Sequence, residues 1–466
     1  MNHETGESPS RPWQVEKYEE SAASTGGFYF DVEDFLEILD YYMAGGDFKK
    51  ALRVSEMALR MHPVAAPLML KKAQLLAALR KEDRALHLLS EVETLEPFNS
   101  EVFLTRAAIF SQMRDYEKAI EEYNKAVSGA EEPDYVYCNI AFEYENLGNF
   151  DKTIEYLGKA LEVNPDNDLA IYEAAFCFDL LSLTEEGISF FNKLIDRHPY
   201  SLEAWFNLGV SHINAGQYEK ALEALDFALA IDQEHEYSWF HKGYVLNLLE
   251  RYPEALEAFT QSLVEEDSDP MKYYYLGEVH EKMDNFLLAY SFYKKATEID
   301  PEVTDAWVGM GVCELENDNP KTALWLFKRG LDLDPENVSY LCLMANTQFT
   351  LGMKEEAATS YEKAVKVDPK DADTWLEYAD ILANSGETKK AAAILRRAVD
   401  TLPGHPALTY NLSACLYLSG RKKEASYYLE EALTKAWEEH RQILEKFPQL
   451  ADIPSFIQAV ERYRPL

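Results

Sequence analysis

The sequence predicts an all-α fold, a solenoid of antiparallel helix hairpins that repeats every 34 residues. Three observations predict it: columns of small residues at that period, a column of bulky residues beside one of them, and glycine and proline at fixed places in the repeat. A chain of 466 residues is too long for one compact core. A repeat array solves this problem because each unit buries its apolar face against its neighbours.

The first column places small residues on the second helix of each predicted hairpin. Its twelve members are Ala51, Ala85, Ala119, Thr153, Gly187, Ala221, Ala255, Ala289, Ala323, Ala357, Ala391 and Ala425. A second column, from Ala58 to Ala432, follows seven residues later and therefore lies on the same stripe of the same helix. Small side chains along this stripe allow a neighbouring helix to approach closely.

A third column of small residues lies on the first helix of each hairpin, twelve residues before the first column. It includes Gly209, Gly243, Gly277 and Gly311. Bulky residues stand four positions ahead of it, among them Trp205, Trp239, Tyr273, Trp307 and Trp375. We expect these bulky side chains to fill the space that the small residues leave.

Proline and glycine mark the ends of the helices. Prolines close most units, at Pro63, Pro97, Pro165, Pro199, Pro301, Pro335, Pro369 and Pro403. Glycines that suit the turn after the first helix are Gly46, Gly148, Gly216, Gly352, Gly386 and Gly420. Three internal units depart from the pattern, because Glu131, Gln233 and Asp267 stand where proline is expected.

The combined pattern resembles the tetratricopeptide repeat, most clearly in the copy that runs from Trp205 through Gly209, Gly216 and Ala221 to Ala228. The resemblance covers about residues 32–439 without an insertion or deletion. It implies a right-handed superhelical solenoid whose first helices line a concave groove. It also implies that the protein binds other polypeptides in that groove.

The ends of the chain lie outside this repeat. Residues 1–29 are rich in Pro, Ser, Gly and charge, so we expect a flexible N-terminal tail. Residues 30–439 form the twelve 34-residue units. Residues 440–466 keep apolar residues but lose the period, which suggests a capping helix region over the last unit.

Charge and cysteine usage narrow the choice of partner and compartment. The chain has 45 Lys and Arg against 82 Asp and Glu, a net charge of −37 that repels nucleic acid and anionic membranes. The five cysteines form no CxxC pair, and no apolar run approaches the length of a membrane span. The opening residues show no secretion signal. We therefore expect a cytoplasmic protein without membrane insertion or nucleic-acid binding.

No motif for catalysis, cofactor binding or metal binding is present in the sequence. HExxH, GxxxxGK[ST], GxSxG and a GxGxxG after a strand pattern are all missing. His235 and His241 are six residues apart, a spacing that does not suit two metal ligands on one helix face. We therefore expect neither an enzyme nor a cofactor.

The expected groove is aromatic and acidic. Four columns on the predicted first helices contain no Lys, Arg or His, so the family's best-known clamp for a peptide's C-terminal carboxylate is not supported. The candidate peptide-binding residues are Tyr135, Phe142, Tyr172, Phe176, Phe206, Tyr237, Phe240, Tyr244, Tyr274, Glu145, Asp179, Glu203, Glu278 and Glu281. These aromatics either contact a ligand or pack between adjacent first helices, and the pattern leaves both interpretations open.

The function that these observations favour is a scaffold or adaptor that binds a basic or amphipathic segment of another protein. A self-assembly module that forms oligomers through the solenoid faces is the alternative. The N-terminal tail or another copy of the chain could also occupy the groove.

Overall fold

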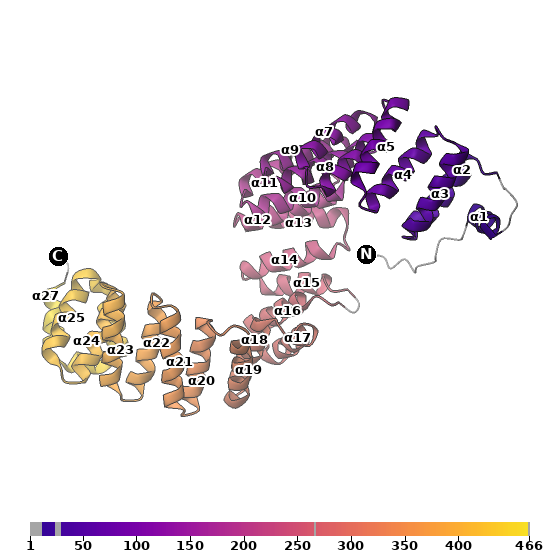
Figure 1. Ribbon diagram of the computed structural model, residues 1–466. Coiled ribbons are helices and arrows are strands. Elements are labelled where there is room, and N and C mark those ends of the chain that lie inside the picture. The colour runs from indigo at the N-terminus through magenta and orange to yellow at the C-terminus, as the bar shows by residue number, and fades with distance from the viewer. Residues whose placement is uncertain (1–11, 24–28, 265–266, 465–466) are drawn as a thin grey trace. The chain divides into compact units, whose positions relative to one another are not determined.

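The computed structural model describes residues 12–23, 29–264 and 267–464, and every regular element in these residues is a helix. Most helices pair into antiparallel hairpins that stack side by side within each unit (Figure 1). The chain divides into two compact units, residues 1–233 and 234–466. In the described residues each unit contributes six hairpins, which confirms the all-α repeat architecture that the sequence predicts.

The first unit begins with a single helix and continues with six hairpins. Its helices are α1 (Trp13–Ala23), α2 (Val32–Ala44), α3 (Phe48–Met61), α4 (Ala66–Ala78), α5 (Glu82–Leu95), α6 (Ser100–Gln112), α7 (Tyr116–Ala126), α8 (Pro133–Asn146), α9 (Phe150–Val163), α10 (Asp168–Leu180), α11 (Thr184–Arg197), α12 (Leu202–Asn214) and α13 (Tyr218–Ile231). A short 3₁₀ turn, Val127–Gly129, extends α7. From α2 onward, even numbers are first helices and odd numbers are second helices.

The second unit holds six more hairpins and a C-terminal extension. Its hairpin helices are α14 (Glu236–Leu248), α15 (Tyr252–Gln261), α16 (Pro270–Lys282), α17 (Phe286–Ile299), α18 (Thr304–Glu316), α19 (Pro320–Leu333), α20 (Val338–Thr350), α21 (Lys354–Val367), α22 (Ala372–Asn384), α23 (Thr388–Thr401), α24 (Pro406–Leu418) and α25 (Lys422–Lys435). The extension consists of α26 (His440–Lys446) and α27 (Pro454–Arg462), with 3₁₀ turns at Trp437–Glu439 and Pro448–Asp452.

The glycines of the third column make room for large side chains on the second helix of the same hairpin. A Cβ atom added to Gly243 would lie 2.7 Å from the ring of Phe259, and one added to Gly311 would lie 2.5 Å from the ring of Phe327. Gly209 meets Leu225 in the same way. The partner is sixteen residues later in each case. The expectation that the bulky first-helix residues fill these spaces is therefore wrong, because second-helix side chains occupy them.

The bulky first-helix column has another role, which links it to the prolines. The indole N–H groups of Trp205, Trp307 and Trp375 donate hydrogen bonds to the carbonyls of the prolines six residues earlier, at 2.9, 2.9 and 3.0 Å. Each tryptophan thus ties its helix to the connection from the preceding hairpin. The tryptophan and proline columns therefore form one repeated contact.

The turn inside every hairpin requires a left-handed backbone. The six glycines that the sequence analysis placed there have φ between 67° and 83°. The other six hairpins reach the same conformation with Arg80, Arg114, Ser182, Glu250, Asp284 and Asp318, whose φ lies between 55° and 62°. Left-handed geometry costs a non-glycine residue about 1–2 kcal/mol, so the packing of the two helices must impose the turn.

Two of the three internal units without a closing proline have shortened second helices. α7 ends at Ala126 and α15 ends at Gln261, both earlier in the repeat than their counterparts. In the second case Asp267 takes the place of proline and binds Lys272, whose side chain is only 4% exposed. Lys272 Nζ lies 2.8 Å from Asp267 Oδ2, 2.8 Å from Glu236 Oε2 and 2.9 Å from the carbonyl of Ser262. This buried ionic cluster joins α14, α15 and α16.

Residues 13–23 differ from the flexible tail that the sequence predicts. They form α1, where Val15 is buried and the Tyr18 ring meets the rings of Phe30 and Tyr42, both at 6.4 Å. The repeat pattern gives no sign of this helix, because its apolar residues are few and it packs against α2 rather than in a repeat hairpin. Residues 1–11 and 24–28, the other parts of the expected tail, lie outside the described residues.

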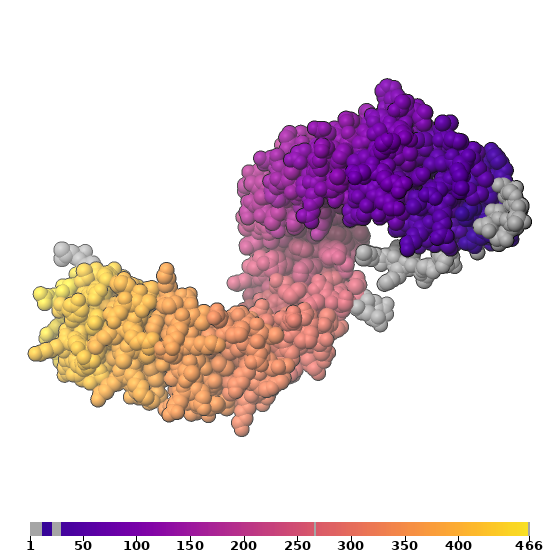
Figure 2. All heavy atoms as spheres, in the orientation of Figure 1, coloured from indigo at the N-terminus to yellow at the C-terminus, as the bar shows by residue number. Residues whose placement is uncertain are grey.

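The C-terminal extension packs on the last hairpins. Ile443, Leu450 and Phe456 are buried, and the Phe456 ring lies edge-on to Tyr417 of α24 at 5.9 Å. Lys446 of α26 forms an ion pair of 2.6 Å with Asp380 of α22. The atoms of this end form one packed surface with the preceding hairpins (Figure 2). We propose that α26 and α27 serve as the cap that a terminal repeat needs.

Replacing Gly311 with Ala should lower the free energy of unfolding of the second unit by about 1–3 kcal/mol, because the buried Phe327 ring cannot move aside. Gly158→Ala is the matched control, since its Cβ would meet only Phe190 at an ordinary 3.7 Å. That change should stabilise α9 by about 0.5–1 kcal/mol through helix propensity. Urea unfolding followed by circular dichroism measures both, and equal effects of the two changes would contradict the packing described.

Replacing Lys272 with Met should cost about 3–5 kcal/mol, because the Asp267 carboxylate would stay buried without its cation. Burial alone would raise the pKa of Asp267, but hydrogen bonds from Lys272 and from two backbone amides outweigh it, so the pKa is lowered. A lowered carboxyl pKa contributes stability that is lost as pH falls through it. The deficit of the variant should therefore be largest near pH 7 and shrink toward about pH 4, where the orphaned carboxyl takes up a proton. A deficit that does not change with pH would contradict this account.

Candidate functional site

All fourteen predicted site residues lie on first helices. The first unit contributes eight, Tyr135, Phe142 and Glu145 on α8, Tyr172, Phe176 and Asp179 on α10, and Glu203 and Phe206 on α12. The second unit contributes six, Tyr237, Phe240 and Tyr244 on α14, and Tyr274, Glu278 and Glu281 on α16. We call the solvent side of these helices the first-helix face of each unit.

In the first unit the aromatic residues divide into exposed and packed side chains. Tyr172 is 68% exposed, Tyr135 is 47% exposed and Phe176 is 45% exposed. Phe142 is half-buried against the core around Cys138 and Leu157. The exposed rings can contact a ligand, whereas Phe142 contributes to packing. Packing therefore accounts for Phe142, and ligand contact stays a prediction for the three exposed rings.

Acidic residues lie on all three of the first-unit helices that carry predicted site residues. Burial is the main reason that the pKa of Glu173 on α10 is raised. The negative charge of Glu145 on α8 lies nearby and raises that pKa further. Asp179 is exposed and accepts a hydrogen bond of 3.1 Å from Asn214 of α12. α8, α10 and α12 together contain seven Asp and Glu residues and no Lys or Arg. Cations on this unit lie on other elements.

In the second unit the aromatic residues pack around Tyr275 of α16. Its ring centroid is 5.6 Å from Phe240, 5.5 Å from Tyr244 and 5.1 Å from Tyr274. It also stacks on Phe259 at 5.6 Å with an angle of 6° between the rings. Phe240, Tyr244 and Tyr274 are half-buried, and Tyr237 is exposed. Much of this group is thus a packed aromatic layer at the base of the first-helix face.

Glu278 and Glu281 stand beside this layer in a region of low solvent access. Burial is the main reason that the pKa of Glu278 is raised, and the negative charges of Glu281 and Asp305 raise this pKa further. The charge of Lys282 and a 3.1 Å hydrogen bond from Asn247 act in the opposite direction but do not outweigh burial. Burial also raises the pKa of Glu281, although Tyr293 Oη donates a 2.7 Å hydrogen bond to it and Lys282 lies nearby. The two carboxylates are therefore held at an energetic cost, as is common where a site serves a ligand.

Two residues of this region were missed by the sequence analysis, Tyr275 and Tyr293. Tyr293 is on a second helix, yet it lies between Gly277 and Gly309, where an added Cβ would come within 2.6 Å and 2.5 Å of its ring. This space lets its hydroxyl reach Glu281. Gly277 and Gly309 indicate that a large side chain lies next to them. The repeat pattern alone does not identify that side chain as Tyr293.

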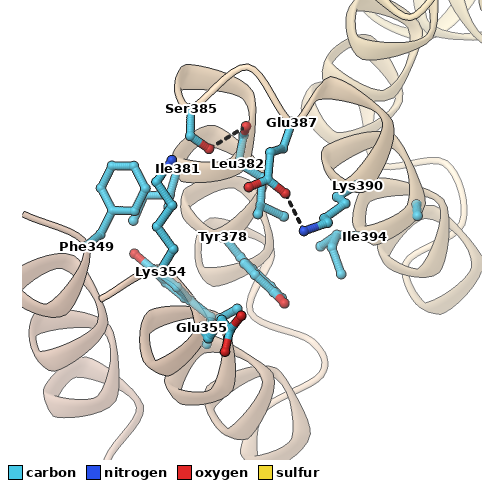
Figure 3. A pocket seen from close by; sticks show the side chains of 13 residues that line it. Phe349, Lys354, Glu355, Tyr378, Ile381, Leu382, Ser385, Glu387, Lys390 and Ile394 are labelled. Atoms are coloured by element: carbon cyan, nitrogen blue, oxygen red, sulfur yellow. Dashed lines mark hydrogen bonds and ion pairs between the residues drawn. The ribbon is translucent and has the colours of Figure 1, made fainter. Parts of the chain in front are cut away.

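A pocket outside the predicted site lies between the tenth and eleventh hairpins (Figure 3). It has a volume of about 410 Å³, and its walls include Phe349, Tyr378 and Ile394. Lys354 and Lys390 extend their side chains at its rim, where Lys390 pairs with Glu387. The size and apolar walls suit one or two apolar side chains of a partner. The repeat pattern gave no sign of this pocket, because it depends on the spacing between α21 and α22.

Two kinds of feature were not found in the part of the chain that the structure describes. No group of three or more His, Cys, Asp or Glu residues there could hold a metal ion. None of its helices is both long enough and apolar enough to cross a membrane.

Family models described as tetratricopeptide repeat match the chain at residues 36–100, 100–130, 135–167, 202–235, 273–303, 342–406 and 382–436. Together these matches cover more than half of the sequence. No curated protein matches the chain.

Three solved structures are similar to the chain. The Cut9–Hcn1 hetero-tetramer of the APC/C is 15% identical with a TM-score of 0.43, over 86% of this chain and 92% of that chain. YrrB, described as a TPR protein with an unusual peptide-binding site, is 23% identical with a TM-score of 0.35, over 40% of this chain and 95% of that chain. MamA is 18% identical with a TM-score of 0.33, over 36% of this chain and 97% of that chain.

Glu278→Gln with Glu281→Gln should leave the second unit at least as stable as the wild type at pH 7. Both glutamates have a raised pKa in the folded state, so the folded protein binds their protons more tightly than the unfolded chain does. The loss of these protons as pH rises therefore lowers the stability of the fold. The wild type should gain stability relative to the variant as pH falls toward the ordinary glutamate value of about 4.3. Thermal unfolding across this pH range measures the difference. A variant that is clearly less stable at pH 7 would show that the carboxylates hold the fold together.

Proposed function

Because this chain belongs to the tetratricopeptide repeat family, we propose that it is a scaffold or adaptor that binds a segment of another protein along its first-helix face. The segment is basic or amphipathic, and it lies as a helix or an extended peptide across several first helices. Recognition of this kind places apolar side chains between helices and aligns charges along the rim.

The observation that carries this proposal is the composition of α8, α10 and α12. They expose Tyr135, Tyr172 and Phe176, and five of their seven acidic residues reach solvent while Asp134 and Glu143 are buried. The three helices contain no Lys or Arg. Exposed aromatic residues are costly to leave in water and dominate the energy of many interfaces. Their grouping on one row of helices supports a binding surface.

Aromatic and acidic residues contribute differently to such a surface. An exposed ion pair is worth only about 0–1 kcal/mol and is weakened by salt. The acids therefore raise the rate of encounter and select against acidic partners. The rings supply most of the affinity, because each can bury a large apolar area in contact with the bound segment.

We also propose that the protein works in the cytoplasm. All five cysteines are free and buried, and burial raises the pKa of Cys138 to about 12 and that of Cys342 to about 11. Thiols held in this form act as small apolar residues and suit a reducing compartment.

Self-assembly is the alternative function. Leu287 and Leu288, at the start of α17, are exposed and line a depression with Phe286 and Asn317. A second copy of the chain that covered this apolar patch would bury both leucines. Molecular mass that rises with concentration, and that does so less after both leucines are changed to Ser, would favour this alternative.

The direct test is a pull-down from cytoplasmic extract with the full chain and two variants. Tyr135, Tyr172 and Phe176 changed together to Ala should weaken capture of a partner at least about tenfold. The matched control changes Phe98 and Tyr200 to Ala, since both are strongly exposed aromatics of the same unit that lie between hairpins. The control should capture the partner as the wild type does.

Circular dichroism must show that both variants are folded, which is expected because surface substitutions usually change stability by less than about 0.5 kcal/mol. Equal capture by the wild type and the first variant would contradict the proposal. So would loss of capture in the control alone.

A further inference from the structure

The second helices of the last four hairpins carry positive charge, although the whole chain carries −37. α19, α21, α23 and α25 contain thirteen Lys and Arg residues against eight Asp and Glu residues, a net charge of +5. The first helices of the same hairpins, α18, α20, α22 and α24, contain six acidic residues and no Lys or Arg. Charge is therefore separated between the two rows of helices in this part of the second unit.

A depression lies within this cationic row, between α19, α20 and α21. Its volume is about 670 Å³. Leu331, Leu341 and Met344 contribute apolar contacts, and Trp325 is 54% exposed. Lys328, Arg329 and Lys363 also line the depression, and Asp332 is the one acidic residue among its lining residues. The depression thus combines an accessible indole ring with three cations.

Trp325 and Arg329 hold each other in place. The Arg329 guanidinium lies 5.9 Å from the centre of the Trp325 ring and 5.7 Å from that of Trp307. The two indole rings meet edge to face at 6.1 Å. Asp332 is 3.9 Å from Arg329, too far for a close hydrogen bond. The guanidinium is therefore positioned by stacking and keeps donors for another acceptor.

Three further groups of the depression, Lys328, Lys363 and the Gln348 amide nitrogen, offer charge or hydrogen-bond donors. Neither Lys328 nor Lys363 forms an ion pair with any residue of the described chain, in contrast to Arg397, which pairs with Glu362 through both carboxylate oxygens. Gln348 is nearly buried and accepts a 2.8 Å hydrogen bond from Ser360 through its oxygen. Its amide nitrogen makes no hydrogen bond within described residues 29–264 and 267–464.

We propose that this depression is a second binding site, which takes an acidic segment of a partner protein that carries an aromatic or large apolar side chain. The apolar side chain packs on Trp325 above Leu341 and Met344. Flanking carboxylates pair with Lys328, Arg329 and Lys363. The site is independent of the first-helix face, and its charge preference is the opposite.

A protein segment fits this surface better than a nucleic acid does. An extended polyanion would meet the net repulsion of a chain that carries −37, to which the six acidic residues of α18 and α22 contribute. A short acidic segment contacts only the cationic row. The pocket of Figure 3 lies on the other side of α21 and gives a second apolar contact to a segment that crosses this helix.

A selection from a random linear peptide library displayed on phage, with the full chain as bait, tests the proposal. One group of enriched sequences should combine several Asp or Glu residues with an aromatic or large apolar residue. A fluorescein-labelled peptide from this group then serves as the probe in anisotropy titrations. Its affinity should fall as salt is raised, because exposed charges are screened.

Three variants locate the site. Lys328→Glu with Lys363→Glu should weaken the probe at least about tenfold, since each charge reversal replaces attraction with repulsion. Trp325→Ala should also weaken it, because the apolar contact is lost. Lys389→Glu with Lys423→Glu is the matched control, with the same change in net charge on exposed lysines outside the depression. The control should stay within about twofold of the wild type, because more distant exposed charges are largely screened.

The proposal is overturned if the selection yields no acidic sequences, or if the folded K328E/K363E variant binds the probe as the wild type does. Displacement of the probe by a single-stranded DNA oligonucleotide that itself binds more tightly would assign the site to nucleic acid instead. Displacement by unlabelled chain, together with a doubled mass, would assign it to a second copy. Variants of the first-helix face that no longer bind a basic peptide test the proposed function alone. Their failure to bind such a peptide does not bear on the site in this depression.

Discussion

The structure depends on one contact that recurs along the chain, between a small residue on the first helix and a large side chain sixteen residues later on the second. At Gly243, Gly277 and Gly311 even a methyl group would collide with the ring of Phe259, Tyr293 or Phe327. The contact fixes how closely the two helices of a hairpin approach and imposes the left-handed turn between them. It also decides which sides of the helices remain in water. The surfaces that carry function are those that this packing leaves exposed.

Electrostatics follow from the same arrangement. First helices pack by apolar and small residues toward their partners, so their remaining surface can be acidic without disturbing the core. Glu278 and Glu281 show the limit of this freedom, because burial beside Tyr274 and Tyr293 raises the pKa of both carboxyl groups. Second helices of the last hairpins place cations on a different surface. One repeat architecture thus presents two surfaces of opposite charge, which would suit a scaffold with two kinds of partner.

The sequence predicts what is periodic and fails where a contact depends on a particular neighbour. The hairpins and the six glycine turns follow from spacing, because every unit must satisfy the same geometry. Spacing does not predict that Phe259, rather than Trp239, fills the space at Gly243, because both are bulky residues close to that glycine in the repeat. α1 was missed because Val15 and Tyr18 gain their stability from Phe30 and Tyr42, not from a repeat. For the site, the helices and their acidic character were predicted. The division into exposed rings such as Tyr172 and packed rings such as Phe240 required the three-dimensional structure.

The measurement that tests the central claim most directly is site-specific photo-crosslinking in cytoplasmic extract. A photoreactive phenylalanine replaces Tyr172 on the first-helix face in one chain, and Tyr200, which is even more exposed but lies between hairpins, in another. The account predicts a discrete crosslinked protein from position 172 that position 200 does not give, and a crosslinked peptide of that protein with basic or amphipathic character. Crosslinks from position 200 alone, or the same products from both positions, would contradict the claim that the first-helix face binds a protein segment.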